Sequence, residues 1–411
     1  MKKQILPPLQ LIIAASSLFL LTGCGSNNTP AQPNADIIVA SDIHYISPRI
    51  NDYGEKFQKV IDGRDGKCMM YIEEITDSFL SEVIEKKPEA LILTGDLTFN
   101  GALESHEDLA EKLRSVEAAG ITVLVLPGNH DVYNPYAASY SEDTSMQVPS
   151  ASTQDFKNIY REFGPDEALS ADTASASYMY QLNDSLRVLM LDFNTVNAMY
   201  SYTDETVEWI EKQLKRAQKD GVYVLAAGHQ NLNAQNELFR SGYVITNAGK
   251  LRQLLTGYGV NLFLSGHMHI QHYTTEDDLT EILTSALSVY PNQYASLEFT
   301  EGEVDYHTVE TNVNADGFDE YGYYCVDKMS NPTREALAET TLTETEQNQI
   351  ADFFTQANYC YFSGDMVSYE AIDPDGEMME FIKEELPEFS DYFRQLEKDK
   401  GKDFRHYHVV P

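Results

Sequence analysis

The stretch Ser265-Gly266-His267-Met268-His269 follows an apolar run at residues 260–264 that is typical of a buried strand. In an extended segment, residues i and i+2 point to the same side. We therefore expect His267 and His269 to reach into one site together, as metal ligands do. A lone pair of histidines near a strand end is more often a surface or core feature, so this interpretation depends on the rest of the chain.

Four further motifs follow short apolar runs earlier in the chain: Asp42-Ile43-His44, Gly95-Asp96, Gly128-Asn129-His130-Asp131 and Gly228-His229. In most of them a glycine comes directly before the candidate ligand, where the chain must bend sharply as it leaves a strand. Five such motifs in one order are hard to obtain by chance. The sequence therefore predicts a site assembled from strand ends.

The charge balance limits the classes of function. The 411 residues include 65 acidic and 29 basic side chains, and the formal net charge is −36. A field of this sign repels a phosphate backbone, so we expect no binding of nucleic-acid polymers. An anionic substrate would need bound cations to attract it locally, which agrees with a metal site.

The N-terminal residues are typical of a secretory signal. Lys2 and Lys3 precede an uncharged, mostly apolar stretch at residues 5–21, which ends in Leu-Thr-Gly before Cys24. This ending resembles the lipobox of bacterial lipoproteins, which implies a lipid on Cys24. We expect a signal peptide and lipobox at 1–24, a flexible tether at 25–35, and anchoring to the outer face of the bacterial cytoplasmic membrane. The alternatives are the periplasm-facing outer membrane, or an ordinary signal peptide with a chance cysteine.

From residue 36 onward, short apolar runs alternate with amphipathic stretches, which indicates a layered α/β domain. We expect strands at 37–40, 90–93, 121–126, 177–182, 186–191, 222–226, 260–264, 279–283, 295–299 and 304–309. Helices are expected at 69–86, 103–119, 156–163, 205–219 and 250–255. Residues 132–175 break this rhythm and are predicted to build part of the pocket. Beyond the domain at 36–310, a helical region at 311–411 is predicted from patterns at 334–338, 345–358 and 377–398.

The order DxH, GD, GNHD, GH and GHxH resembles that of the calcineurin-like metallophosphoesterase superfamily, and the chain is identified as a bacterial lipoprotein member. The resemblance covers residues 36–309. It implies an α/β fold, a four-layer αββα sandwich, to which the C-terminal helical region is an appendage. It also implies two metal ions, one held by Asp42, His44 and His269, the other by Asn129, His229 and His267, with Asp96 bridging both.

This ligand set mixes nitrogen and oxygen atoms, which suits Mn, Fe, Co, Ni or Zn better than Ca or Mg. We therefore expect two divalent or trivalent transition-metal ions. Two metals about 3.5 to 4 Å apart neutralise phosphoryl oxygens and provide a bridging hydroxide for in-line attack on phosphorus. His130 is placed to protonate the leaving group or stabilise the transition state, and Asp131 is expected to orient His130 and raise its basicity.

We therefore predict a metal-dependent phosphoesterase that hydrolyses phosphate mono- or diesters. Cyclic nucleotides, nucleotides, phospholipid headgroups and wall polymers all remain open as substrates. The alternative is a non-catalytic metal- or ligand-binding surface lipoprotein of the same fold, against which the complete ligand set and His130 argue. The role of Gln230, beside His229, stays open. Cys68, Cys325 and Cys360 are expected as buried free thiols, with a bond between Cys325 and Cys360 as the alternative.

Overall fold

The structure, a computed structural model, describes residues 32–62, 66–196 and 198–409. The expected signal peptide and Cys24 lie outside the described residues, as does most of the expected tether. No helix in the described part of the chain is both long enough and apolar enough to cross a membrane.

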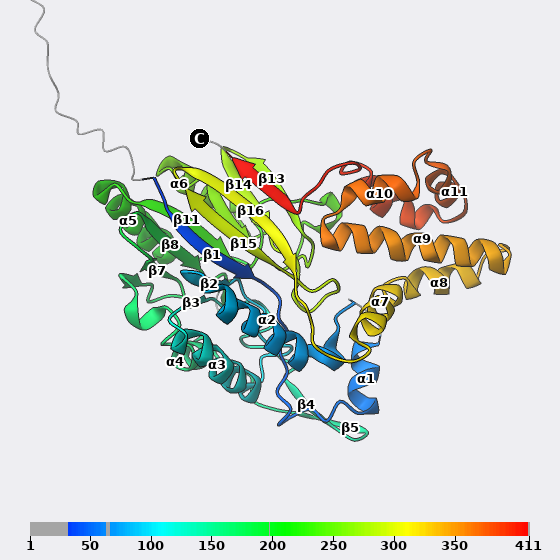
Figure 1. The fold of residues 1–411 in the computed structure, drawn as a ribbon, viewed down its shortest axis with the longest axis horizontal. Helices are drawn as coiled ribbons and strands as arrows, with labels where there is room; N and C mark the ends of the chain where they lie inside the picture. The colour runs from blue at the N-terminus through cyan, green and yellow to red at the C-terminus, as the bar shows by residue number, and fades with distance from the viewer. Residues whose placement is uncertain (1–31, 63–65, 197, 410–411) are drawn as a thin grey trace, which may run out of the picture.

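Two mixed sheets form the centre of the molecule (Figure 1). In spatial order, the first contains β17 (His406–Val409), β16 (Glu303–Glu310), β15 (Gln293–Thr300), β1 (Ala35–Ala40), β2 (Ala90–Leu93) and β3 (Thr122–Val125). The second contains β13 (His272–Glu276), β14 (Leu279–Leu283), β12 (Leu262–Ser265), β11 (Tyr223–Gly228), β8 (Leu186–Leu191), β7 (Tyr178–Gln181) and β6 (Ser170–Ala171).

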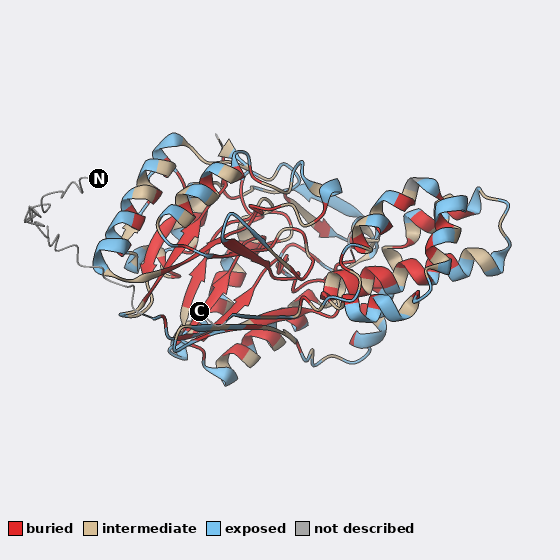
Figure 2. Cartoon of the chain, turned by 90° about the horizontal axis from the view of Figure 1, so that it is seen from above, coloured by how far each residue is buried: buried red, intermediate tan, exposed pale blue. Residues whose placement is uncertain are grey.

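The two faces of each sheet bury different sets of side chains. In β1, Ile37 and Val39 pack between the sheets, whereas Ile38 and Ala40 pack beneath helices α2 (Ile72–Lys86) and α3 (Leu103–Ala118). This alternation follows from the two-residue period of a strand. Helices α5 (Asp204–Asp220) and α6 (Ala248–Gly257) cover the outer face of the second sheet in the same way. The predicted four-layer αββα arrangement is confirmed (Figures 1 and 2).

Parallel pairing brings the motif-bearing strand ends together. Strands β1, β2 and β3 run parallel to one another, as do β8, β11, β12 and β14. The carboxyl ends of parallel strands lie at the same edge of a sheet. The loops that leave these ends carry all five motifs identified in the sequence.

The C-terminal helices project from one end of the sandwich (Figure 2). They are α7 (Phe318–Lys328), α8 (Asn331–Ala338), α9 (Glu344–Ser363), α10 (Met366–Ile372), α11 (Glu377–Glu385) and α12 (Ser390–Leu396). The helical pattern predicted at 377–398 forms two helices, because a 3-10 turn (Pro387–Phe389) separates α11 from α12 and proline cannot continue a helix. The chain then returns to the first sheet, where β17 pairs antiparallel with β16.

Several elements were not expected from the sequence. Within 132–175 the structure contains a hairpin of β4 (Ala138–Ser141) and β5 (Thr144–Gln147). The helix expected at 156–163 is α4 (Thr153–Ile159), which begins earlier because Ser152 caps it. The described cysteines are all free thiols. Cys325 lies beside Cys68, with which it shares a hydrogen bond, so the alternative bond to Cys360 is not formed.

Candidate metal centre

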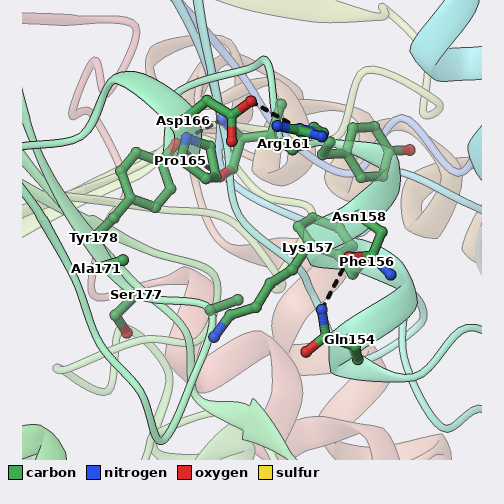
Figure 3. A pocket seen from close by; sticks show the side chains of 13 residues that line it. Gln154, Phe156, Lys157, Asn158, Arg161, Pro165, Asp166, Ala171, Ser177 and Tyr178 are labelled. Carbon is green, nitrogen blue, oxygen red and sulfur yellow. Dashed lines mark hydrogen bonds and ion pairs between the residues drawn. The ribbon is translucent and has the colours of Figure 1, made fainter.

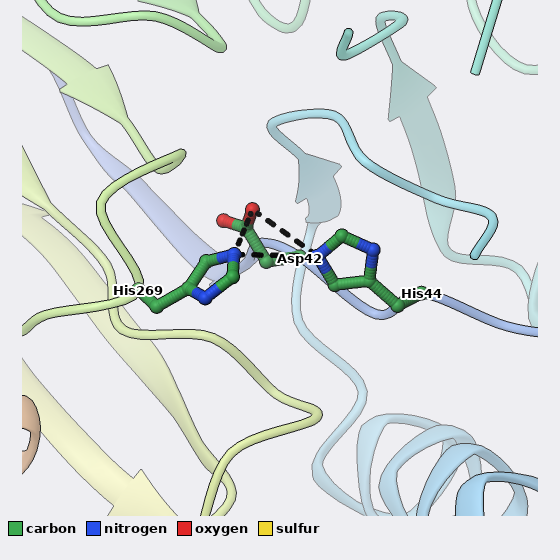
Figure 4. Close-up of side chains that lie close together, drawn as sticks. All are labelled: Asp42, His44 and His269. Carbon is green, nitrogen blue, oxygen red and sulfur yellow. Dashed lines mark hydrogen bonds and ion pairs between the residues drawn. The ribbon is translucent and has the colours of Figure 1, made fainter. Parts of the chain in front are cut away.

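Asp42, His44 and His269 converge on one point (Figure 4). One potential ligand atom from each lies within 4.8 Å of the others. The Nε2 atoms of His44 and His269 are 3.3 Å apart, and His269 Nε2 lies 3.3 Å from Asp42 Oδ1. These three residues come from the loop after β1 and the loop after β12, so the cluster joins the two sheets.

Asp96, His229 and His267 form a second cluster of the same size. His229 Nε2 lies 3.3 Å from Asp96 Oδ2 and 3.2 Å from Asn129 Oδ1. The other nitrogen, His229 Nδ1, donates to the Thr94 carbonyl at 2.9 Å, so Nε2 is the nitrogen that would bind a metal. His267 Nε2 similarly donates to the Gly242 carbonyl at 2.7 Å and leaves Nδ1 for a metal.

Asp96 lies between these clusters. Its Oδ2 is 3.3 Å from His229 Nε2 on one side and 3.9 Å from His44 Nε2 on the other. A carboxylate in this position can offer an oxygen to each of two neighbouring cations. All seven sequence-predicted ligands therefore meet at one centre, arranged as two groups with Asp96 between them.

The chemistry of the centre fits bound cations. Asp42 Oδ1 is buried and makes no hydrogen bond of good geometry within the described part of the chain, although His269 Nε2 and His44 Nε2 lie 3.3 and 3.7 Å from it. A buried anionic oxygen in such surroundings is costly unless a cation satisfies it. Burial lowers the pKa of His267 to about 4, with a further contribution from His229, so His267 is a neutral ligand at physiological pH. Burial would also lower the pKa of His229, but Asp96 and Asp42 outweigh it and raise that pKa to about 9. The carboxylates thus attract a positive charge, which a metal ion would provide.

The ligand loops have unusual backbone conformations. Positive φ angles occur at five of the seven predicted ligands: Asp42 (54°), His44 (53°), Asp96 (48°), His267 (70°) and His269 (61°). Such conformations are disfavoured for residues other than glycine and cluster at functional sites. The expectation of an extended His267–His269 segment is wrong, because β12 ends at Ser265. Both histidines still enter the centre, but each belongs to a different cluster.

Gly266 is required where these loops meet. A Cβ atom at this position would lie 1.7 Å from Ser41 Oγ and 2.5 Å from Asp42 Oδ2. The close approach allows the His267 amide to donate to Asp42 Oδ2 at 2.9 Å. Only glycine permits this contact between the first and fifth motifs.

A profile of calcineurin-like phosphoesterases matches residues 35–271, which is more than half of the chain. The chain belongs to the calcineurin-like phosphoesterase family. A 3′,5′-cyclic-nucleotide phosphodiesterase of Nostoc sp. is 25% identical over 54% of this chain and 73% of its own length. A probable cyclic nucleotide phosphodiesterase of Moraxella catarrhalis is 21% identical over 45% of this chain and 60% of its own length.

Among solved structures, a dimetal phosphatase from Danio rerio superposes with a TM-score of 0.47 at 13% identity, over 67% of this chain and 96% of that one. Family membership together with the two Asp/His clusters makes this chain a metal-dependent phosphoesterase, as predicted.

In this phosphoesterase His130 is half-exposed beside both clusters. Its ring centroid is 4.8 Å from that of His44, and its Nε2 is 4.0 Å from Asp96 Oδ2. His130 Nδ1 donates to the Phe99 carbonyl at 2.7 Å. The carbonyl therefore fixes the ring, and Nε2 faces the centre.

The expectation that Asp131 orients His130 is not met. The Asp131 carboxylate instead accepts from the backbone amides of Leu97, Thr98 and Gly128 at 3.0, 2.8 and 2.8 Å. It is fully buried, and burial raises its pKa. Asp131 therefore ties the Asp96 loop to the loop that carries Asn129 and His130.

The roles of two supporting residues of the phosphoesterase were not identified from the sequence. Gln230 Nε2 donates to Asn194 Oδ1 at 2.6 Å and lies 3.5 Å from Asn129 Oδ1, so it helps to hold that predicted ligand. The buried Glu281 accepts from Ser265 Oγ at 2.7 Å and from the Asn233 amide at 2.7 Å. Glu281 thus joins the loops that carry His229 and His267. The sequence signal that could have identified Glu281 is a charged residue in the middle of an apolar strand.

Two cavities meet at His130. One, of about 490 Å³, is also lined by His269 and by C-terminal helices. The other, of about 660 Å³, is lined by Asn100, Asn134 and the β4–β5 hairpin. A third cavity, of about 400 Å³, lies against α4, and the Arg161–Asp166 ion pair forms part of its lining (Figure 3). Neither His130 nor any predicted ligand lines this third cavity, whereas His130 lines both of the others.

Proposed function

We propose that this phosphoesterase hydrolyses phosphodiesters of the cyclic-nucleotide type. The observation that carries the proposal is the pair of Asp/His clusters that share Asp96, in a chain similar to proteins named cyclic nucleotide phosphodiesterases.

The proposed ligands divide by cluster. Asp42, His44 and His269 would hold one ion, and Asn129, His229 and His267 the other, with Asp96 shared. Manganese, iron, zinc, cobalt and nickel suit these donors. When bound, the ions supply positive charge for the phosphoryl oxygens and make water nucleophilic near neutral pH.

His130 would handle the proton of the leaving group. With Nδ1 held by the Phe99 carbonyl, Nε2 is the nitrogen that faces the centre. Protonated there, it donates to the departing oxygen as the ester bond breaks. Asp131 would act as a positioning residue for the His130 loop through the Gly128 amide.

Hydrolysis of matched esters tests the proposal. The full chain is stripped with a chelator, reloaded with manganese or zinc, and assayed with 3′,5′-cyclic AMP, bis(p-nitrophenyl) phosphate and p-nitrophenyl phosphate. We expect metal-dependent turnover with a larger kcat/KM for the diesters. Preference for the monoester would overturn the diesterase assignment. Tight metal binding without turnover of any ester would favour the non-catalytic binding lipoprotein.

We also propose that Cys24 carries a lipid that anchors the enzyme outside the cytoplasm. The support is the charged start, the apolar stretch at 5–21 and the Leu-Thr-Gly-Cys ending in the sequence. Cys24→Ser should move the protein into the soluble fraction, because acyl chains are the membrane attachment that the sequence offers. A variant that still sediments with membranes after a carbonate wash would refute the anchor.

A further inference from the structure

The cavity of about 490 Å³ beside the metal centre combines two distant parts of the chain. His130 and His269 form the side that opens on the centre. The opposite wall comes from α9 and from residues 389–392, which lie outside the family match at 35–271. The volume is within the range of about 300–1,000 Å³ that small-molecule sites occupy.

An aromatic surface leads from a predicted metal ligand into this cavity. The Tyr243 ring lies 5.2 Å from the His267 ring and 5.3 Å from the Phe239 ring, measured between centroids. The Gly242 carbonyl accepts from His267 Nε2 at 2.7 Å, which fixes this segment against the centre. A planar group attached to a phosphate that is bound at the centre would therefore contact these aromatic rings first.

The opposite wall carries one amide side chain, Asn358, among aromatic side chains. Phe354, Asn358 and Tyr361 follow a helical spacing that places them on one face of α9. Asn358 is only 7% exposed, and its Oδ1 accepts from the Tyr392 hydroxyl at 2.7 Å. Its Nδ2 makes no hydrogen bond to any residue that the structure describes, and Asn358 lines the cavity. This N–H group is therefore available to donate to an acceptor on a bound ligand.

The wall is attached to the ligand loop itself. The Gln271 amide donates to the Phe362 carbonyl at 3.0 Å, and Gln271 Nε2 donates to the Phe404 carbonyl at 3.1 Å. Met268, between the two ligand histidines, packs into the core of the C-terminal helices. The distance from the metal centre to the α9 wall is thus fixed by direct contacts.

We propose that this cavity is a subsite for a nucleobase carried by the phosphoester substrate, with the C-terminal helices as the specificity element. The aromatic rings pack against the base, and Asn358 Nδ2 donates to a ring nitrogen or carbonyl oxygen of the base. The assignment of nucleotides as substrates rests on the proposed function, whereas base binding does not require catalysis. Neutral rings also avoid the repulsion that a chain of net charge −36 exerts on anions.

Binding of phosphate-free nucleosides to the full chain tests this subsite. Adenosine and guanosine are titrated calorimetrically, with ribose as the ligand that lacks a base. We expect a nucleoside to bind and ribose not to bind. Asn358→Leu should weaken nucleoside binding about tenfold, which is the scale of one lost hydrogen bond. Asn348→Leu, at an exposed position of the same helix, is the matched control and should leave binding unchanged.

Asn358→Asp serves as a second, nearly isosteric variant, which keeps the oxygen that accepts from Tyr392 and removes the donor. It should weaken binding at least tenfold while circular dichroism stays that of the wild type. Equal binding of ribose and nucleosides, or wild-type binding by both Asn358 variants, would overturn the subsite. A chain that cleaves cyclic nucleotides without binding nucleosides would retain the proposed function and lose the subsite. Nucleoside binding without any ester hydrolysis would retain the subsite and contradict the proposed function.

Discussion

The metal centre and the α9 wall of the cavity beside it are stabilised by different interactions. The centre consists of buried carboxylates and imidazoles on loops with positive φ angles. The wall consists of aromatic side chains on a regular helix, in a core that includes Phe353, Phe354 and Phe393. Loss of one ligand therefore leaves buried charges without partners, whereas loss of one wall contact removes only part of a packed surface. We expect the centre to be intolerant of substitution and the wall to tune affinity.

Asp96→Asn should have the largest effect. The amide is nearly isosteric but removes the charge between the two clusters, so both ions lose a ligand. We expect kcat/KM to fall on the order of 10³-fold or more for every ester, because metal assistance contributes several kcal/mol to such reactions. The metal content should fall as well, which elemental analysis of the purified variant measures.

Asp184→Asn, at an exposed position, is the matched control for this substitution. It should keep two equivalents of metal and wild-type turnover. Two tightly held equivalents with normal turnover in Asp96→Asn itself would show that Asp96 is not shared between the ions.

His130→Ala should have the next largest effect, and only with some substrates. A nitrophenolate leaves readily without a proton, whereas an alkoxide does not. We expect a small loss with nitrophenyl esters and a loss of roughly 10²-fold or more with cyclic nucleotides, within the range of general acid catalysis. Metal content should stay unchanged. The same loss for both leaving groups would instead assign His130 to charge stabilisation or positioning.

The sequence predicted the centre well because the chemistry restricts both residue type and position. Each ligand had to be aspartate, asparagine or histidine, and each followed an apolar strand. The contacts of Asp131 could not be predicted this way, because neighbours in sequence, such as Asp131 and His130, point to different partners once the loop folds. The φ angles of His267 and His269 were missed for a related reason, since the end of β12 depends on its pairing with β14.

The wall could not be predicted from its residues. Phe354, Asn358 and Tyr361 have the spacing of an ordinary buried helix face, and most of their aromatic neighbours do serve as core. Only the three-dimensional arrangement places them opposite His269. Likewise, nothing in the pattern of residues 406–409 indicated that this short segment pairs with β16.

Glu281→Gln tests the hydrogen bonds by which Glu281 joins the loops that carry His229 and His267. Burial raises the pKa of Glu281 to about 7 from an ordinary 4.5. The folded chain therefore retains a proton that the unfolded chain loses, and the stabilisation present below pH 4.5 disappears as the pH rises through 7. The glutamine side chain does not titrate. Relative to the wild type, the free energy of unfolding of the variant should rise by about 3 kcal/mol between pH 4 and pH 8.

Urea denaturation at a series of pH values measures this difference. The glutamine variant loses one acceptor oxygen for the loop amides, so it is expected to be the less stable protein at low pH. A difference between the two proteins that does not change with pH would mean that Glu281 is ionised throughout and acts only through its hydrogen bonds.

Thr343→Ala should have the smallest effect and acts on the wall alone. Thr343 caps α9 in a capping box, in which its hydroxyl accepts from the Glu346 amide and its own amide donates to Glu346 Oε2. This end of α9 lies far from the sheets (Figure 1). Loss of such a cap lowers the free energy of unfolding by about 1 kcal/mol. Denaturant unfolding should show this decrease, while metal content and hydrolysis of bis(p-nitrophenyl) phosphate stay at wild-type values.

Thr345→Ala, at an exposed position in the same helical turn, is the matched control and should change neither stability nor metal content. If Thr343→Ala lowered metal content, the helices and the centre would form one cooperative unit, and their division into a rigid centre and a tunable wall would be wrong.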